Sequence, residues 1–344
     1  NAVKTEITGS TAITGSTLNL AAESKSGIIG FSGGLAAGGA AVILSLSANV
    51  ITNTTQAMIT AGADVDSVGA VTLSAKDTSS IDALAIGVSA GGGAVGVALG
   101  ANVITNRIET AISGATVDVS AGTLSLSSES SAIIRSLALG VSAGGFAVQV
   151  TVQGNAVVNT VKAHITNSTV YAYDDITVAA RDIAPSVIPD WIVPADDQDD
   201  LDACLTDSPV GLANANILAV MVGVAGAGTT AVNVSLLGNA VTNTISADIV
   251  GSTVRAGVNT AGTITHAGAD VSLTALSGAG IIAITAGVGA SGEIAVSFTG
   301  FGNVITNSLA ASVEGGSVVR TSGQVVQTAR DTSNIASIGL SIAV

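Results

Sequence analysis

The chain contains few charged and few aromatic residues. Charged residues make up 10% of its 344 positions and aromatic residues 2%, whereas 48% are hydrophobic. A disordered chain has the opposite balance of charge and hydrophobicity, and a compact core normally takes much of its bulk from aromatic side chains. The apolar residues are mostly Ala, Val and Ile, which are small or β-branched and suit closely stacked strands.

Cysteine and basic residues are also scarce. The single cysteine, Cys204, excludes an internal disulfide framework and a cysteine-based zinc site. The formal charge is −14, from 24 acidic and 10 basic residues. Nucleic acid binding needs a basic face, so we expect no nucleic acid partner. Gly and Ser interrupt every long apolar run, and we therefore expect no membrane insertion in this segment.

One phrase, Asn-x-x-x-Asn after a short apolar run, occurs five times. Its first Asn falls at positions 49, 102, 155, 239 and 303, at intervals of 53, 53, 84 and 64 residues. A fixed period of this size indicates a repeat architecture. The residues of the five pairs are Asn49 and Asn53, Asn102 and Asn106, Asn155 and Asn159, Asn239 and Asn243, and Asn303 and Asn307.

Each repeat alternates apolar and small or polar residues between turns such as Gly144-Gly145 and Thr166-Asn167-Ser168. This is a hairpin signal, and no segment keeps a helical period. One hairpin cannot bury its faces alone, whereas stacked repeats can. The sequence therefore predicts an all-β fold, an elongated β-solenoid-like stack of repeats of about 53 residues with long strands and Gly-rich turns. Equivalent strands would pair at ~4.8 Å, or at about twice that spacing if another strand intervenes.

We take residues 1–344 as a single continuous array and as a fragment of a longer chain, because it starts and ends within the pattern. Separate β-sandwich modules are the alternative. Against them, a 53-residue repeat is short for a sandwich and no linker separates the repeats.

At each Asn pair, the bulky side chains move from one set of alternate positions in the strand to the other. Val95, Val97 and Leu99 form the bulky set before Asn102, but Ile104 and its equivalents on the opposite parity form it afterwards. We therefore expect a bulge, a bend or a second covering layer near each pair. Because Asn carries a donor and an acceptor, stacked Asn residues form hydrogen-bonded ladders. A structural ladder of all ten asparagines is our main interpretation, and a ligand or metal role is the alternative.

A second periodic feature is acidic, with acids near the start of each long strand and Ser277 in place of the acid in the fifth copy. A column of like charges would repel, so it would need solvent, paired bases or a cation. A Ca²⁺ ion bridging the column is therefore a possible cofactor, although Ca²⁺ takes about six to eight oxygen ligands and one acid per layer supplies few of them. We expect no other cofactor. The column comprises Glu23, Asp77, Glu129, Asp182 and Asp331.

Residues 185–214 form an insertion that holds all four prolines, the only Trp and seven acids. Insertions in solenoids map to loops that often bind partners. We read it either as a tolerated surface loop or as a partner or cation contact. A smaller insertion at 257–268 predicts an extra loop. The residues of the possible contact are Trp191, Asp196, Asp197, Asp199, Asp200 and Asp202.

The runs Gly87-Val88-Ser89-Ala90-Gly91-Gly92 and Gly140-Val141-Ser142-Ala143-Gly144-Gly145, with the Asn-Val-Ile-Thr-Asn phrases, resemble a known class. They are similar to the Val/Ala/Gly-rich repeat regions of very large secreted bacterial filamentous adhesins, of the leukotoxin-like and filamentous-haemagglutinin-like kind. The resemblance implies export to the cell surface or the extracellular space, a filament role and no catalysis.

The residues themselves indicate no enzyme. His164 and His266 lie at unrelated positions of their repeats, and no nucleophile motif with partners is present. We therefore expect a structural extracellular fibre or adhesin stalk. Its small-residue faces, such as Ala138, Gly140 and Ser142, would allow self-association into filaments or bundles, and a cell-surface or glycan partner is possible. One alternative is a spacer that presents residues 185–214, and a less favoured one is a β-helix enzyme acting on polysaccharide.

Overall fold

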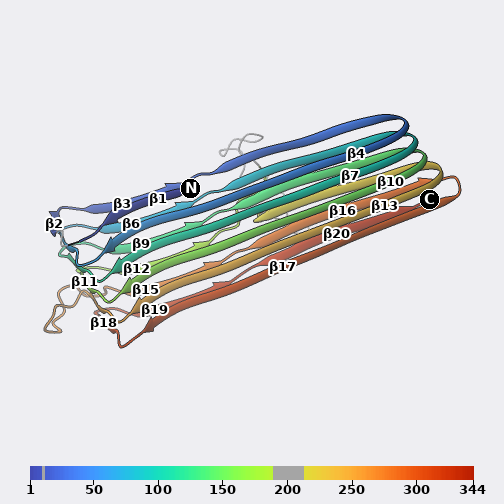
Figure 1. Ribbon diagram of the computed structural model, residues 1–344. Coiled ribbons are helices and arrows are strands. Elements are labelled where there is room, and N and C mark those ends of the chain that lie inside the picture. The colour runs from blue at the N-terminus through green and yellow to red at the C-terminus, as the bar shows by residue number, and fades with distance from the viewer. Residues whose placement is uncertain (10–11, 189–212) are drawn as a thin grey trace.

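The computed structural model describes residues 1–9, 12–188 and 213–344, and its secondary structure consists of strands. The chain winds through five coils, each made of a long strand, a short strand and a seven-residue strand (Figure 1). Part of a coil precedes the first and part follows the fifth. The predicted all-β, β-solenoid-like stack of about 53-residue repeats is confirmed.

The long strands of the first four coils have 34 residues each, and that of the fifth coil is divided in two. They are β4 (Gly27–Thr60), β7 (Ser80–Ser113), β10 (Ile133–Thr166), β13 (Ile217–Val250) and the pair β16 (Gly280–Ser291) and β17 (Ile294–Glu314). The flanking partial coils contribute β1 (Ala2–Ile7) and β20 (Asn334–Ala343).

The other strands form two further sheets. The short strands are β2 (Ala12–Gly15), β5 (Asp64–Ser67), β8 (Thr116–Val119), β11 (Thr169–Ala172), β14 (Thr253–Ala256) and β18 (Val318–Thr321). The seven-residue strands are β3 (Leu18–Ser24), β6 (Val71–Asp77), β9 (Leu124–Ser130), β12 (Ile176–Asp182), β15 (Val271–Ser277) and β19 (Val325–Asp331).

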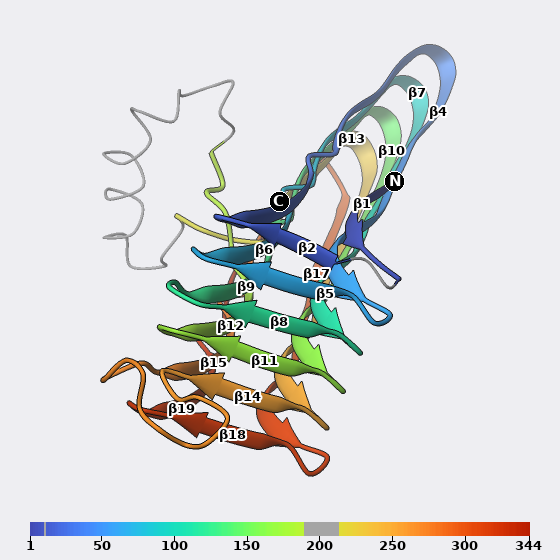
Figure 2. The same cartoon turned by 90° about the vertical axis from the view of Figure 1, so that its left-hand side faces the viewer.

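All three sheets are parallel, and each strand pairs with its equivalent in the next coil (Figure 2). Asn102, for example, pairs with Asn49 on one side and with Asn155 on the other. The stack therefore rises by one strand spacing, ~4.8 Å, for each coil. No strand intervenes between equivalent strands.

Each long strand folds back on itself at a Gly-rich turn, so that Figure 1 shows U-shaped ends stacked on one another. In β10 the outgoing leg covers residues 133–143 and the returning leg residues 146–166, with a shift of register at Gly144/Phe146. The turn predicted at Gly144-Gly145 is present. The predicted hairpin is wrong, because the two legs pair with neighbouring coils and not with each other. Both legs form backbone hydrogen bonds to neighbouring coils, and they face each other through their side chains.

We call the two facing legs, up to the first Asn of each pair, the arm, and the rest of the coil the base. The base is enclosed by all three sheets, and its interior is filled by bulky aliphatic residues. Ile108, Ile112, Leu73 and Val117 lie in one continuous cluster and are at most 1% exposed. Burial of such side chains stabilises a fold by roughly 1.5–3 kcal/mol each.

The arm interior is filled by small and polar residues. Ala138 and Ser142 on the outgoing leg face Gln149 and Thr151 on the returning leg, and all four are fully buried. Ser142 donates a hydrogen bond to Gln149 Oε1 at 2.8 Å. Gly140 lies opposite Gln149, where an added Cβ would clash with the Gln149 side chain and would meet Thr151 Oγ1 at 2.6 Å.

This geometry corrects two expectations. The small-residue face of Ala138, Gly140 and Ser142 packs on the other leg of its own coil, so it makes no contact between chains. Moreover, the strands run through the Asn pairs without a bulge, and the same face stays inside along the whole returning leg. What changes is the layer opposite the strand, because the narrow arm admits only small inward residues and the wide base admits bulky ones.

The two kinds of glycine give a test of this account. Gly140→Ala should lower the unfolding free energy by about 1–3 kcal/mol, because the new Cβ overpacks a filled interior. Gly154→Ala should be neutral or slightly stabilising, because its added Cβ meets nothing within 4 Å. Chemical denaturation of the two variants beside the parent chain measures the difference, and equal stability of the two would contradict the packing described for the arm.

Candidate functional site

The first Asn of each pair forms a hydrogen-bonded ladder along the stack. Asn49 Nδ2 donates to Asn102 Oδ1 at 2.8 Å, and Asn102 donates to Asn155 at the same distance. Asn155 continues to Asn239 at 2.8 Å and Asn239 to Asn303 at 2.7 Å. The ladder residues of the middle coils are at most 4% exposed. Each therefore finds its donor and acceptor partners in the coils above and below it.

The second Asn of each pair behaves differently, because it donates to an aspartate at the end of a seven-residue strand. Asp77 accepts from Asn53 and Asn106, both at 2.8 Å. Asp182 accepts from Asn159 and Asn243, both at 2.9 Å. One carboxylate thus serves two coils, and each of its oxygens receives an amide donor. In the fifth coil Asn307 donates to Asp331 at 3.0 Å.

This inward column alternates between Asp and Ser along the stack. Asp77 pairs with Ser130, Ser130 with Asp182, and Asp182 with Ser277. The carboxylates are therefore about two strand spacings, ~9.6 Å, apart. Doubling the spacing lowers the repulsion that acids in successive coils would suffer.

The five acids predicted to share one column in fact lie in two. Glu23 and Glu129 both pair with Lys76, on the outward side of the strand, whereas Asp77 points inward. Glu23 and Asp77 are 54 residues apart in the sequence, one more than the 53-residue register of these strands, and one residue moves a side chain to the opposite face.

The outward column alternates acids with bases from β3 to β12 and then continues with Leu276 and Arg330. Lys76 Nζ lies 3.0 Å from Glu129 Oε1, and Arg181 pairs in register with Glu129 on the other side. The bases provide the neighbours that a purely acidic column would have needed from a cation. Among the residues that the structure describes, no group of three or more His, Cys, Asp or Glu side chains is placed to hold a metal ion.

Two acids of the inward column, Asp182 and Asp331, have pKa values that shift in opposite directions. Asp182 is fully enclosed, and burial raises its pKa from 3.8 to about 7, against the opposing effect of the hydrogen bonds from Asn243 and Asn159. The buried Oδ1 atoms of Asn159 and Asn243 have no hydrogen-bond partner in the described chain.

Asp331 in the fifth coil is the contrasting case. Burial acts to raise the pKa of Asp331, but the hydrogen bonds from Ser333 and Asn307 outweigh it, and the pKa lies below its ordinary value. The two acids occupy equivalent places, but Asp182 is buried and Asp331 is exposed.

The 185–214 insertion leaves the stack between β12 and β13. The residues predicted as a partner or cation contact, from Trp191 to Asp202, lie outside the described residues. Its two ends are described, and they pair through Ser186 and Asn214.

Arg135 on β10 holds the beginning of this insertion in place. It donates from Nε to the carbonyl oxygen of Val187 at 2.8 Å and from Nη2 to that of Ser186 at 3.1 Å. Arg135 Nη1 also lies 3.2 Å from Asp82 Oδ1. An open cavity of about 710 Å³ lies beside this point, with Lys25, Lys76 and Arg135 among its lining residues. Sequence reasoning missed Arg135, because its partners are 51 to 53 residues away.

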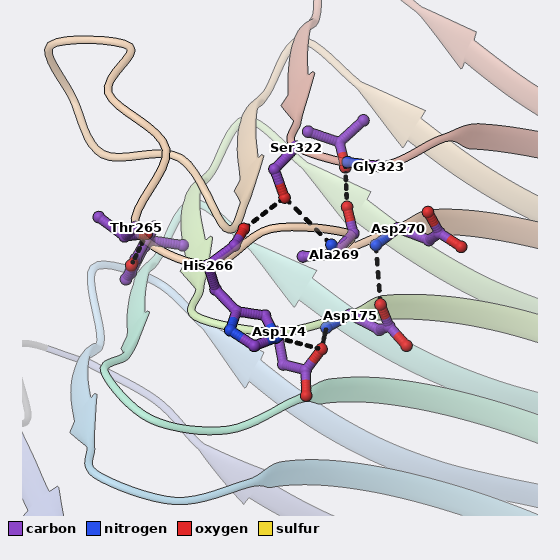
Figure 3. Close-up of polar contacts among 10 residues, drawn as sticks. Asp174, Asp175, Thr265, His266, Ala269, Asp270, Ser322 and Gly323 are labelled. Carbon is purple, nitrogen blue, oxygen red and sulfur yellow. Dashed lines mark hydrogen bonds and ion pairs between the residues drawn. The ribbon is translucent and has the colours of Figure 1, made fainter.

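The smaller insertion, 257–268, forms the predicted extra loop at the base, with a bridge between Val258 and Ile264. Figure 3 shows how it is fastened: Ser322 donates to the carbonyl oxygen of His266 at 2.5 Å and accepts from the amide of Ala269 at 3.0 Å. The His266 ring lies 4.7 Å from that of Tyr173, and its Nε2 is 3.8 Å from Asp174 Oδ1. His164 lies on β10, in contact with Glu109, so the structure does not bring the two histidines together.

No family model, curated protein or solved structure matches the chain. Within the described residues there is no helix of the length and apolarity that crossing a membrane requires. The geometry of the columns is therefore the basis for the proposals that follow.

Breaking the Asn ladder should weaken the stack. In Asn155→Ala the buried amide of Asn102 loses its acceptor and that of Asn239 its donor, and each unsatisfied group costs about 1–3 kcal/mol. Denaturant titration followed by circular dichroism measures the loss of stability. Thr105→Ala, at an exposed outward position, is the matched control and should be nearly neutral. A ladder that contributes nothing would leave both variants alike.

Asp182 should make stability depend on pH. Folded Asp182 keeps a proton that the unfolded carboxyl has released, so its stabilising effect is complete below about pH 4 and is lost as pH rises to about 7. The expected loss is roughly 1–4 kcal/mol, measured as unfolding free energy across this range.

Asp182→Asn should remove this loss, whereas Asp64→Asn, at an exposed position of β5, should retain it. An unchanged pH profile in Asp182→Asn would show that the group titrates normally.

Proposed function

We propose that the chain is part of a structural extracellular fibre or adhesin stalk with no catalytic role. The supporting observation is the unbroken pairing of equivalent residues through all five coils, including the one that follows the long insertion. Arrays of this kind gain length coil by coil, because each repeat contacts only its neighbours. The resemblance to filamentous adhesin repeats supports the same role and a location at the cell surface or outside the cell.

The direction of the backbone hydrogen bonds also favours a stalk. They run along the stack, and each 34-residue strand forms them with its neighbour along both legs. The ladder of Asn49, Asn102 and Asn155 continues in the same direction.

A second candidate function is a spacer that presents the 185–214 insertion to a partner or cation. The observation that favours it is the rigid attachment of the insertion, through Arg135 to Ser186 and Val187 and through the Ser186–Asn214 bridge. Cell-surface structures and glycans are the partners that this hypothesis names.

Force spectroscopy along the stack tests the stalk. Handles at Thr54→Cys and Ser308→Cys, in a Cys204→Ser background, attach to outward positions of the first and fifth coils. We expect stepwise rupture, with each released coil of about 53 residues adding roughly 180 Å of extended chain. Smooth extension without steps would contradict the proposed role.

The control is the same chain without residues 189–212, which retains the Ser186–Asn214 bridge. It should show the same number of rupture steps, with the step of the shortened coil smaller by roughly 80 Å. Binding of both chains to a glycan array and to cultured cells then separates the two functions. Binding that disappears with the segment would favour the spacer, and binding that persists would exclude it.

A further inference from the structure

The outward side of the returning leg is apolar throughout the arm. We call this surface the arm face; it consists of the five outward positions between residues 42 and 50 and their equivalents in the other coils. These positions hold Val, Leu, Phe, Ala or Gly in all five coils, and the first of them is always Val. None is charged. Val42 is 72% exposed at one side of the stack, and Leu236 is still 39% exposed with paired coils on both sides.

The arm face ends one residue after the first Asn of each pair. Beyond it, most outward positions of the same strand are polar, as Thr105 and Arg107 show in β7 and Thr160 and Lys162 in β10, although Val158 is apolar. The arm therefore has small and polar residues inside and apolar residues outside. Internal packing does not require this arrangement, because the outward side chains do not contact the opposite leg.

A groove crosses the arm face along the stack. Its floor is formed by Gly154, Gly238 and Gly302, and Val152 and Leu236 stand beside it, around a cavity of about 450 Å³. An added Cβ at any of the three glycines would meet no atom within 4 Å, and none of them has positive φ. Neither packing nor backbone conformation explains glycine here. Close approach of an external surface does.

The dimensions of the arm face suit a protein partner. Nine residues along the strand and five coils cover about 30 Å by 24 Å, so that two such faces would bury roughly 1,400 Å² in total. This lies within the range of stable protein interfaces, about 1,200–2,000 Å². Sheets that pack face to face lie about 10 Å apart, which the small residues of the groove permit.

The arm face is uncharged and therefore lets a second copy of this chain approach. The chain has a net charge of −14, which would repel another copy at most approaches, but the arm face itself is uncharged. The same net charge opposes contact with an anionic membrane surface. Each copy also supplies both halves of a complementary surface, namely the Val and Leu rows as ridges and the Gly and Ala row as a groove.

We infer that the arm face is a self-association surface, on which two copies pack their returning legs face to face with the apolar rows of one in the groove of the other. This pairing uses a different surface from the buried small-residue face expected from the sequence. It does not depend on the proposed stalk, since it concerns solution association of the 344-residue chain. Failure of the force test leaves it standing, and its own failure leaves the stalk standing.

The test is sedimentation of the whole chain over a range of concentrations, with two variants of the arm face. Gly238→Trp fills the groove from a position where an added Cβ meets no atom within 4 Å, and Val150→Glu puts a charge on the face. Each should raise the dimer dissociation constant about tenfold or more, as loss of a central contact does at other interfaces. Thr160→Glu and Thr160→Trp, outward on the base of β10, are the matched controls and should leave association unchanged.

Circular dichroism of each variant checks that the fold is retained, and a complementary pair removes any remaining ambiguity. Val150→Lys mixed with Val150→Glu should form a mixed dimer, although neither dimerises alone. A wild-type chain that stays monomeric, or association that Gly238→Trp does not weaken, would overturn the inference. Flotation of the monomeric chain with phosphatidylcholine vesicles, abolished by Val150→Glu, would assign the arm face to lipid and would overturn it as well.

Discussion

In-register pairing between equivalent residues of successive coils is the constraint on which the rest of this structure depends. Every side chain lies above and below its own equivalent, so each position along the coil becomes a column of similar chemistry. Asn tolerates this stacking, because each amide donates to one neighbour and accepts from the other. An acid does not, and the inward column accordingly alternates Asp77 and Asp182 with serines.

The distance between facing layers decides which side chains each column can hold. Where the two legs of the long strand face each other, Gly140 lies against Gln149, and nothing larger would fit. Where three sheets surround the interior, Ile108 and Leu73 fill it. The Asn pair lies at the boundary between these regions. There the bulky residues pass from the outside of the strand to the inside, although the strand itself runs straight on.

Insertions do not disturb this order. β10 and β13 remain paired along their length, although the Asn residues of their ladder are 84 positions apart in the sequence. The extra residues leave and re-enter at a turn between sheets, where Arg135 fixes the point of departure. A repeat whose contacts are only with its neighbours can accommodate such a segment at a turn without breaking the columns on either side.

Much of the candidate site was predictable, because the repeat period can be read from the spacing of the Asn pairs in the sequence. Five Asn pairs at related spacings, turns rich in Gly and strands of alternating residues determine a stack of coils. They also place the ten asparagines in columns, since any other register would separate equivalent residues.

Only the tertiary structure decided which face lies inside and which partners meet. Alternation has a period of two and separates two faces of a strand, but it is symmetric with respect to inside and outside. The pattern separated Val95 and Val97 from the small residues without saying which set lies inside, and in the arm both point outward. The same property places Glu23 and Asp77 on opposite faces, because they are 54 residues apart and the register of their strands is 53 residues. Contacts such as Asn106 with Asp77, or Arg135 with Val187, join segments that only the closure of the coil brings together.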